Sequence, residues 1–219
     1  MNTPEFLSEI YKGCDTGFIT ITSLPSRNTK WFKVDDIKKV AKTAENIGKK
    51  TNVFFGVGLR NKVLKNGLRG SEKDISCIGA LYADIDVKGD AHAEKSLPET
   101  EAASFLNNLD IKPSIIVNSG NGIHGYWLLK EPFNIENTQD RSYIVSIFKE
   151  FGRYINLKAK KHGWRIDNIY DLARILRVPG TINHKLKDGA MCEVIESNLK
   201  RYSLDKFSQY VHCNDIIAP

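Results

Sequence analysis

Two aspartates spaced two residues apart, Asp84 and Asp86, carry the strongest chemical signal in the sequence. They lie in an apolar, β-branched run, residues 78–87, that has the composition of a buried β-strand. Because side chains alternate along a strand, both carboxylates point to one face, roughly 6–7 Å apart. At an effective dielectric constant of about 20 they repel each other by about 2–3 kcal/mol. A divalent cation would remove this repulsion. The alternative is a strand end at which both carboxylates meet water.

A glycine-rich turn supplies a second group of polar atoms. Residues 113–129 have the pattern strand, turn, strand, and the turn has the sequence Ser-Gly-Asn-Gly-Ile-His from Ser119 to His124. Glycines allow backbone N–H groups to approach an anion closely, as in a phosphate-binding nest. Ser119 adds a hydroxyl, and His124 begins the return strand. An ordinary hairpin with an incidental histidine would give the same pattern.

The densest cluster of charged residues lies between residues 164 and 185. Asp167 is expected at the end of an extended segment. Residues 171–176 are predicted to form a short helix with Asp171 at its N-cap. This leaves Asp167 as the better metal ligand. Arg174, Arg177 and Lys185 supply positive charge for a triphosphate or for template phosphates. A surface cluster of salt bridges is the alternative.

The remaining pattern predicts the elements that position these groups. Strands are expected over residues 17–24, 52–59 and 190–196, and helices over 35–48, 99–109, 136–161 and 204–211. Residues 60–70 read as a basic, glycine-punctuated loop. Its four cations, Arg60, Lys62, Lys65 and Arg69, either touch a phosphate backbone or are simply solvated.

Composition sets limits on the class of protein. The chain has 219 residues, of which 41% are hydrophobic and 26% charged, as in a globular protein. Its apolar runs are too short to span a bilayer and its start does not resemble a secretion signal, so we expect a cytoplasmic protein without a membrane partner. The four cysteines are scattered, which argues against a zinc ribbon or a disulfide framework. The net charge of +6 gives a modest tendency to bind polyanions.

In their order and approximate spacing, the three motifs resemble those of the archaeo-eukaryotic primase superfamily, in the branch of RepB-like primases and CRISPR-associated primase-polymerases. The resemblance covers roughly residues 15–195. It implies an α+β fold in which an N-terminal αβ unit packs on an RRM-like antiparallel sheet, with the active site in the cleft between them. The corresponding division is a single catalytic domain, with residues 1–75 as the αβ unit, 76–200 as the catalytic unit and 201–219 as a tail.

The resemblance also implies roles for individual residues. Asp84, Asp86 and Asp167 match the catalytic carboxylates, which hold two Mg²⁺ or Mn²⁺ ions, and Asp171 is the fallback for Asp167. His124 matches the histidine that contacts the phosphates of the incoming nucleotide. The other residues of the implied nucleotide site are Ser119, Asn121 and Gly122 in the turn and Arg174, Arg177, Asn183 and Lys185 in the basic run. Tyr82 shares a strand face with Asp84 and is a candidate contact for the sugar.

The implied activity is template-dependent nucleotidyl transfer by a two-metal mechanism, which makes or extends DNA or RNA primers from dNTPs or NTPs on single-stranded DNA. The sequence has no recognisable zinc stem, helicase or helical accessory domain, so primer extension is better supported than de novo priming. An accessory domain, or CRISPR or replication proteins, would be partners.

Two other functional classes stay open. One is a single-stranded nucleic-acid-binding replication module without catalysis. The other is a metal-dependent nuclease or relaxase. The five dispersed histidines disfavour the relaxase, which needs a histidine cluster and a nucleophilic tyrosine.

Overall fold

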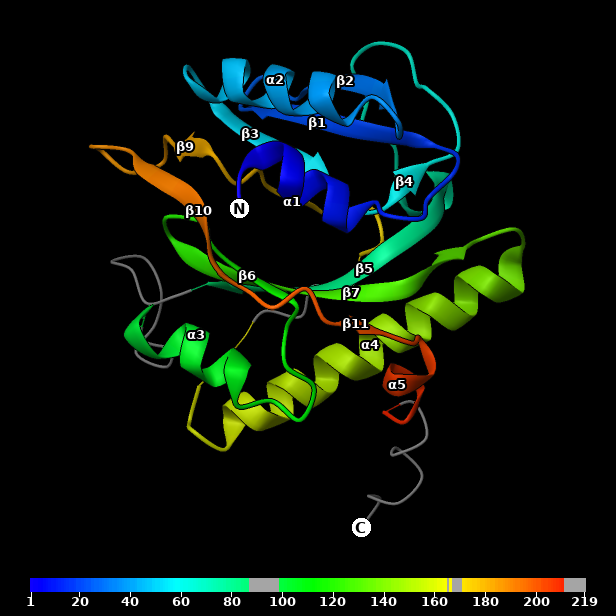
Figure 1. Cartoon of the computed structure of the whole chain (residues 1–219), viewed down its shortest axis with the longest axis vertical. Coiled ribbons are helices and arrows are strands. Elements are labelled where there is room, and N and C mark those ends of the chain that lie inside the picture. Colours follow the sequence, from blue (N-terminus) through cyan, green and yellow to red (C-terminus); the bar gives the residue numbers. More distant parts are fainter. Residues whose placement is uncertain (87–98, 165, 167–170, 211–219) are drawn as a thin grey trace.

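One sheet, bent into two parts, is the framework of the chain in the computed structural model (Figure 1). The structure describes residues 1–86, 99–164, 166 and 171–210. The strands follow the order β8-β3-β1-β4-β5-β7-β6-β10-β9, with β2 paired to β1 and β11 to β7. Their bounds are β1 Phe18–Leu24, β2 Asn28–Lys33, β3 Asn52–Gly56, β4 Leu59–Arg60, β5 Ile75–Asp86, β6 Ile115–Asn118, β7 Gly122–Asn134, β8 Ile175–Arg177, β9 Thr181–Asn183, β10 Ala190–Ser197 and β11 Arg201–Tyr202.

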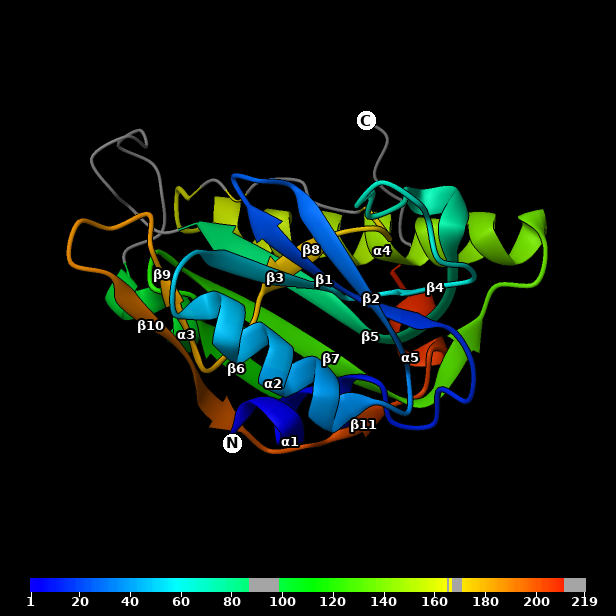
Figure 2. The same ribbon diagram turned by 90° about the horizontal axis from the view of Figure 1, so that it is seen from above.

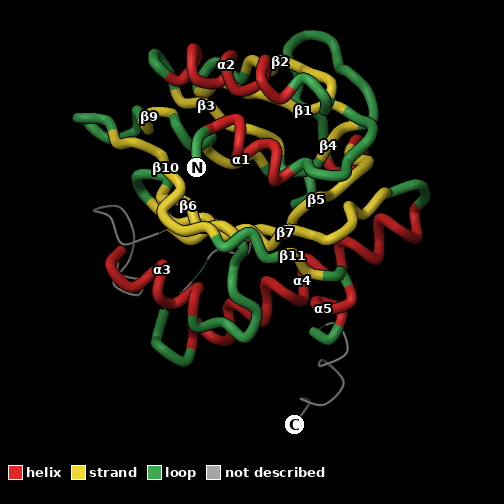
Figure 3. The backbone as a smooth tube through the Cα atoms, in the orientation of Figure 1, coloured by secondary structure: helices red, strands yellow, loops and turns green. Residues whose placement is uncertain are grey.

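Helices cover the sheet in separate layers (Figure 3). Their bounds are α1 Thr3–Ile10, α2 Ile37–Gly48, α3 Glu99–Asn107, α4 Thr138–Lys160 and α5 Asp205–Ser208, with a 3₁₀ turn over Glu72–Asp74. Figure 1 shows α3, α4 and α5 on the far side of β5, β6 and β7. Figure 2 shows α2 running alongside the N-terminal strands β1 and β3. This is the α+β architecture expected from the sequence.

Helix α1 joins the two parts of the sheet. Asn2 and Glu5 form a capping box that begins the helix. The ring of Phe6 contacts Phe55 of β3 at 5.4 Å and Tyr126 of β7 at 5.3 Å between centroids. All three rings are buried. The helix therefore fills the space between the N-terminal strands and the inner face of β7.

The largest departure from the predicted elements concerns residues 171–176. They do not form a helix, because Ile175–Arg177 is strand β8, which pairs antiparallel with β3. Asp171 accepts a hydrogen bond from the Ala173 backbone N–H at 2.8 Å, so it caps a turn rather than a helix. This strand returns the chain from the second half of the sequence to the N-terminal part of the sheet.

Other predicted bounds also change. The strand expected over residues 52–59 ends at Gly56, although the Val57 N–H still donates to the carbonyl of Arg174, the next residue in the register with β8. The helix expected over 204–211 is confined to Asp205–Ser208. Within the described residues, none of the helices has the length and apolar character needed to cross a membrane.

Arg60 corrects one expectation about the basic loop. It lies in β4 and its side chain is fully buried, so it cannot contact a phosphate backbone. Its guanidinium donates to the carbonyls of Gly58, Arg69 and Ala173 at 2.5, 3.2 and 3.1 Å. Burial lowers the pKa of Arg60 to about 10. Through these hydrogen bonds the arginine links β4 to the basic loop and to the residues that precede β8.

Candidate active site

Asp84 and His124 face each other across the central strand pair. Strands β5 and β7 are antiparallel, and their register sets Asp84 opposite His124 and Asp86 opposite Gly122. The distance from Asp84 Oδ1 to His124 Nε2 is 3.5 Å. Two of the three motifs found in the sequence therefore meet at one point of the sheet.

Arg174 completes this contact from the other part of the sheet. Its Nη2 donates to Asp84 Oδ2 at 2.7 Å. The backbone around Arg174 is held at both ends, because its N–H donates to Asp171 and its carbonyl accepts from Val57. The third motif thus reaches Asp84 through the segment that leads into β8.

Burial of the His124 ring favours its neutral form. The residue is 4% exposed, and its Nδ1 lies 3.3 Å from the hydroxyl oxygen of Tyr126. Burial lowers the pKa of His124; Asp84 opposes this shift, while Arg177 and Arg174 add to it. The imidazole is therefore neutral near pH 7, and the positive charge beside Asp84 belongs to the arginines.

Arg177 is anchored more firmly than Arg174. It is 4% exposed, its Nη1 donates to Asn52 Oδ1 at 2.7 Å, and its guanidinium carbon lies 4.8 Å from the centroid of the Phe54 ring. Burial lowers the pKa of Arg177. Asn52 also accepts from the backbone N–H of His184 at 2.9 Å, so it ties β8 to the residue after β9.

The glycine-rich turn is fixed by hydrogen bonds of its own and by Asn183. The Ser119 hydroxyl donates to the Gly122 carbonyl at 3.0 Å, and the Gly120 N–H donates to Asn118 at 2.8 Å. Buried Asn183 donates to the Ser119 carbonyl at 3.0 Å. The turn of the second motif is thereby joined to the basic run of the third.

The remaining predicted residues lie around this centre. Tyr82 is buried, its hydroxyl donates to the Asp171 carbonyl at 2.6 Å, and its ring contacts Phe148 of α4. These contacts give Tyr82 a packing role, and the sugar contact stays a prediction. Lys185 is exposed beside Asn183, to which its N–H donates. Asn121 is half-buried in the turn.

The third carboxylate, Asp167, lies outside the described residues, and the side chain of Asp86 is not described either. Within the described part of the chain, no three His, Cys, Asp or Glu side chains gather as a metal site. The Asp84 carboxylate offers the hard oxygen donors that Mg²⁺ and Mn²⁺ prefer, and Asp86 lies two residues further along β5. The chemistry of Asp84 is thus compatible with a metal ion, and metal binding by both aspartates stays a prediction.

Two residues of the site were not singled out by sequence reasoning. Tyr126 lies two positions after His124 on β7, so strand alternation alone sets it on the same face. Asn52 begins β3, and no local pattern indicates that its side chain bonds both Arg177 and residue 184. The position of Tyr126 beside His124 was detectable from residue spacing, whereas the role of Asn52 depends on long-range strand pairing.

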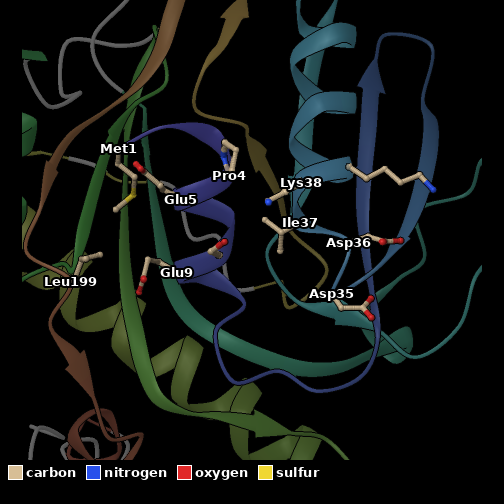
Figure 4. A pocket seen from close by; sticks show the side chains of 11 residues that line it. Met1, Pro4, Glu5, Glu9, Asp35, Asp36, Ile37, Lys38 and Leu199 are labelled. Carbon is tan, nitrogen blue, oxygen red and sulfur yellow. The ribbon is translucent and has the colours of Figure 1, made fainter.

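Several cavities lie outside this centre, and two of them bear on the argument. One of about 770 Å³ opens between α1 and α2, beside residues such as Glu5, Glu9, Asp35 and Ile37, and none of the predicted site residues lines it (Figure 4). A second of about 480 Å³ is lined by Arg27, Arg69 and Ile175, together with Thr22, Leu24, Gly67 and Leu68. Ile175, which lines the second cavity, directly follows Arg174 of the candidate site in the sequence.

The arrangement of strands and helices is that of the archaeo-eukaryotic primase (AEP) catalytic fold. The AEP domain of the primase-polymerase from cyanophage S-2L superposes with a TM-score of 0.60 at 14% sequence identity, covering 94% of this chain and 95% of that domain. The catalytic domain of the primase RepB′, solved in complex with initiator DNA, superposes with a TM-score of 0.56 at 9% identity over 98% of each chain. The fold expected from the motif resemblance is thereby confirmed.

Sequence comparison finds a curated relative among replication proteins. The chain is 24% identical over 190 residues to a replication protein of Clostridium perfringens. The match covers 85% of this chain and 41% of the relative, so the chain spans less than half of that protein. No protein-family model matches the chain.

Proposed function

We propose that this chain is a template-dependent nucleotidyltransferase that makes or extends DNA or RNA primers from dNTPs or NTPs. The observation that carries the proposal is the meeting of Asp84, His124 and Arg174 on the AEP fold, at 3.5 and 2.7 Å from the Asp84 carboxylate. A carboxylate, a neutral imidazole and a guanidinium from three separate motifs have little structural reason to converge at one partly exposed point.

Metal ions would be held by Asp84 and Asp86, with Asp167 as the predicted third ligand. Two bound Mg²⁺ or Mn²⁺ ions would activate the 3′-hydroxyl and stabilise the pyrophosphate leaving group. Arg174 and His124 would then stabilise charge on the triphosphate. Arg177 and Asn183 hold β8 and the turn in place, so their contribution is to position these groups.

The DNA partner is best placed at the N-terminal sheet. Arg27 and Arg69 are exposed and line the cavity that adjoins β8. The loop that carries Arg69 is held to β2, because the Thr29 N–H donates to Gly67 and the Trp31 indole donates to Leu68. We propose that this surface binds the phosphates of the single-stranded template.

The test is a primer assay on a single-stranded DNA template with Mg²⁺ or Mn²⁺ and mixed dNTPs and NTPs, with and without an annealed primer. We expect elongated strands from the wild-type chain and none from Asp84→Asn/Asp86→Asn. Asp35→Asn, which removes a carboxylate at the cavity between α1 and α2, is the matched control and keeps full activity. Products without a primer would indicate priming, and products only with one would indicate extension.

Two outcomes would favour the other functional classes. Normal DNA binding with no product in any lane would leave a binding module. Shortened or nicked strands would indicate a nuclease. The RepB-like plasmid or phage context and the CRISPR-associated context, with their accessory proteins, are both compatible with this activity, and the CRISPR association stays a prediction.

DNA binding has its own test. Neutralised phosphates make the logarithm of affinity fall with the logarithm of salt concentration, with a slope of about −0.7 per phosphate on single strands. Arg27→Ala/Arg69→Ala is expected to weaken binding and to make the slope shallower. Lys12→Ala/Arg153→Ala, which removes an exposed cation in the turn after α1 and another on α4, is the control. An unchanged slope in the first variant would place the template elsewhere.

A further inference from the structure

Tyr126 is the residue of the site whose contacts are least explained by packing alone. It follows His124 by two residues on β7, and its hydroxyl lies 3.3 Å from His124 Nδ1. The ring is fully buried and is fixed by Phe6 of α1 and by Phe55 of β3, with centroids at 5.3 and 6.3 Å. The hydroxyl is therefore held in one place relative to the imidazole.

The hydroxyl proton of Tyr126 favours one of the two neutral tautomers of the His124 ring. A buried hydroxyl must donate its proton or lose a hydrogen bond, at a cost on the order of 1–3 kcal/mol. Among the described residues, His124 Nδ1 is the acceptor within reach. An unprotonated Nδ1 leaves the ring proton on Nε2.

Asp84 favours the same arrangement from the other side of the ring. Its Oδ1 lies 3.5 Å from His124 Nε2, and an ionised carboxylate can only accept hydrogen bonds. The opposite tautomer would direct an Nε2 lone pair at this oxygen and leave the Tyr126 proton without its acceptor. Both neighbours of the imidazole therefore select the Nε2–H form.

We propose that Tyr126 is a positioning residue that fixes the Nε2–H tautomer of His124 and so presents this ring as a hydrogen-bond donor to the triphosphate of the incoming nucleotide. The part of the inference that concerns the triphosphate rests on the proposed function. A neutral donor suits this site, because Arg174 and Arg177 already supply positive charge close to Asp84. Tyr126 acts through His124 and does not itself touch the substrate.

The first measurement reads the tautomer directly and needs no activity. Histidine-¹⁵N-labelled protein is prepared without metal or nucleotide, and the ring nitrogens are observed by long-range ¹H–¹⁵N NMR. Loss of one set of signals in His124→Gln assigns His124 among the five histidines. We expect the Nε2–H pattern in the wild-type chain and averaged nitrogen shifts in Tyr126→Phe, as the two tautomers exchange.

Tyr11→Phe is the matched control. Tyr11 is also buried, its ring also contacts Phe55, and its hydroxyl donates to the Gly56 carbonyl at 2.6 Å rather than to a histidine. It therefore loses one buried hydroxyl from the same core. We expect its His124 signals to match those of the wild-type chain. Unchanged His124 signals in Tyr126→Phe, or the same change in both variants, would overturn the inference.

A kinetic measurement separates this inference from the proposed function. With primer and template saturating, Tyr126→Phe is expected to raise KM for the nucleotide about fivefold to tenfold, the effect of one hydrogen bond, with DNA affinity unchanged. A tautomer change with no polymerase activity in the wild-type chain would refute the proposed function and keep the positioning role. Full activity with an unchanged KM in Tyr126→Phe would refute the role toward the triphosphate.

Discussion

At the scale of single residues, the charge of Asp84 is balanced by Arg174, a residue 90 positions away in the chain. The Arg174 side chain is 33% exposed, so solvent screens the pair, and we expect it to contribute about 0–1 kcal/mol to stability. We expect Arg174 to matter for the reaction rather than for stability. Arg174→Ala is expected to reduce primer extension at least tenfold, while the melting temperature falls by no more than about 4 °C.

The control for Arg174 is another arginine in an ion pair. Arg153 on α4 is exposed and lies 4.0 Å from Glu150. Arg153→Ala is expected to keep both activity and melting temperature. Wild-type extension rates in Arg174→Ala would contradict a role for this guanidinium in the reaction.

His124 makes stability depend on pH. Its pKa is lowered in the folded protein, so below the ordinary value of about 6.5 the unfolded chain binds a proton that the folded protein resists. Protonation of the unfolded chain therefore costs the folded protein stability, and this loss is small above pH 6.5 and grows as the pH falls below it. Between pH 7.5 and 5.5 the wild-type chain is expected to lose up to about 1.4 kcal/mol more than His124→Gln.

Urea unfolding at both pH values, in the presence of a chelator, measures this difference. Carboxylates far from His124 are unchanged between the two proteins, so their contribution cancels in the comparison. An identical pH dependence for the wild-type chain and His124→Gln would mean that the ring is not held neutral by burial.

At this scale, the sequence indicates which residue types are available but not which of them meet. Asp84 and His124 both stand out from the local pattern. Their contact depends on the register of β5 against β7, which is a property of the folded sheet. Arg174 was predicted on a helix, and only the pairing of β8 with β3 brings it to Asp84. Metal binding by Asp84, Asp86 and Asp167 stays a prediction.

At the scale of elements, the glycine-rich turn tests how tightly the second motif is held. Gly120 has φ +83°, and a Cβ there would lie 2.8 Å from the Ala190 Cβ and 3.2 Å from the Asn183 Cβ. Gly163 has a similar φ of +78° but no atom within 4 Å of an added Cβ. Gly163→Ala therefore measures backbone strain alone, about 1–2 kcal/mol.

Gly120→Ala adds a steric clash to the same strain. We expect it to reduce the free energy of unfolding by a further 1–3 kcal/mol, roughly the cost of overpacking. It is also expected to weaken nucleotide binding, because Asn183 holds this turn. If urea unfolding showed equal losses of unfolding free energy for the two variants, β10 and Asn183 would be able to move away from the added Cβ without loss of stability.

The predicted elements succeed where a local pattern is long. The helix expected over residues 136–161 is α4, Thr138–Lys160, because its apolar stripe persists over many turns. The sequence reasoning missed α1 and β2. Helix α1 has only eight residues, and β2, Asn28–Lys33, alternates Lys30 with Trp31 and Phe32 too briefly to stand out. Such short elements are stabilised by tertiary contacts rather than by their own propensity.

At the scale of the whole molecule, the two parts of the sheet share backbone hydrogen bonds. Strand β4 pairs with β1 and with β5, β8 pairs with β3, and α1 contacts both parts. We expect a single cooperative transition in urea, with tryptophan fluorescence and far-UV circular dichroism superimposing. Two separated transitions would show that residues 1–75 and 76–200 unfold independently.

The position of Trp31 gives the protein a built-in optical reporter. Of the three tryptophans, Trp127 is fully buried beneath α4, whereas Trp31 is half-buried on β2 and its indole is tethered to Leu68. Any oligonucleotide that settles against Arg69 must disturb the neighbourhood of this indole. Intrinsic tryptophan fluorescence can therefore follow oligonucleotide binding in real time on the unlabelled chain. Trp31→Phe is the control, because it lacks the signal that comes from this indole.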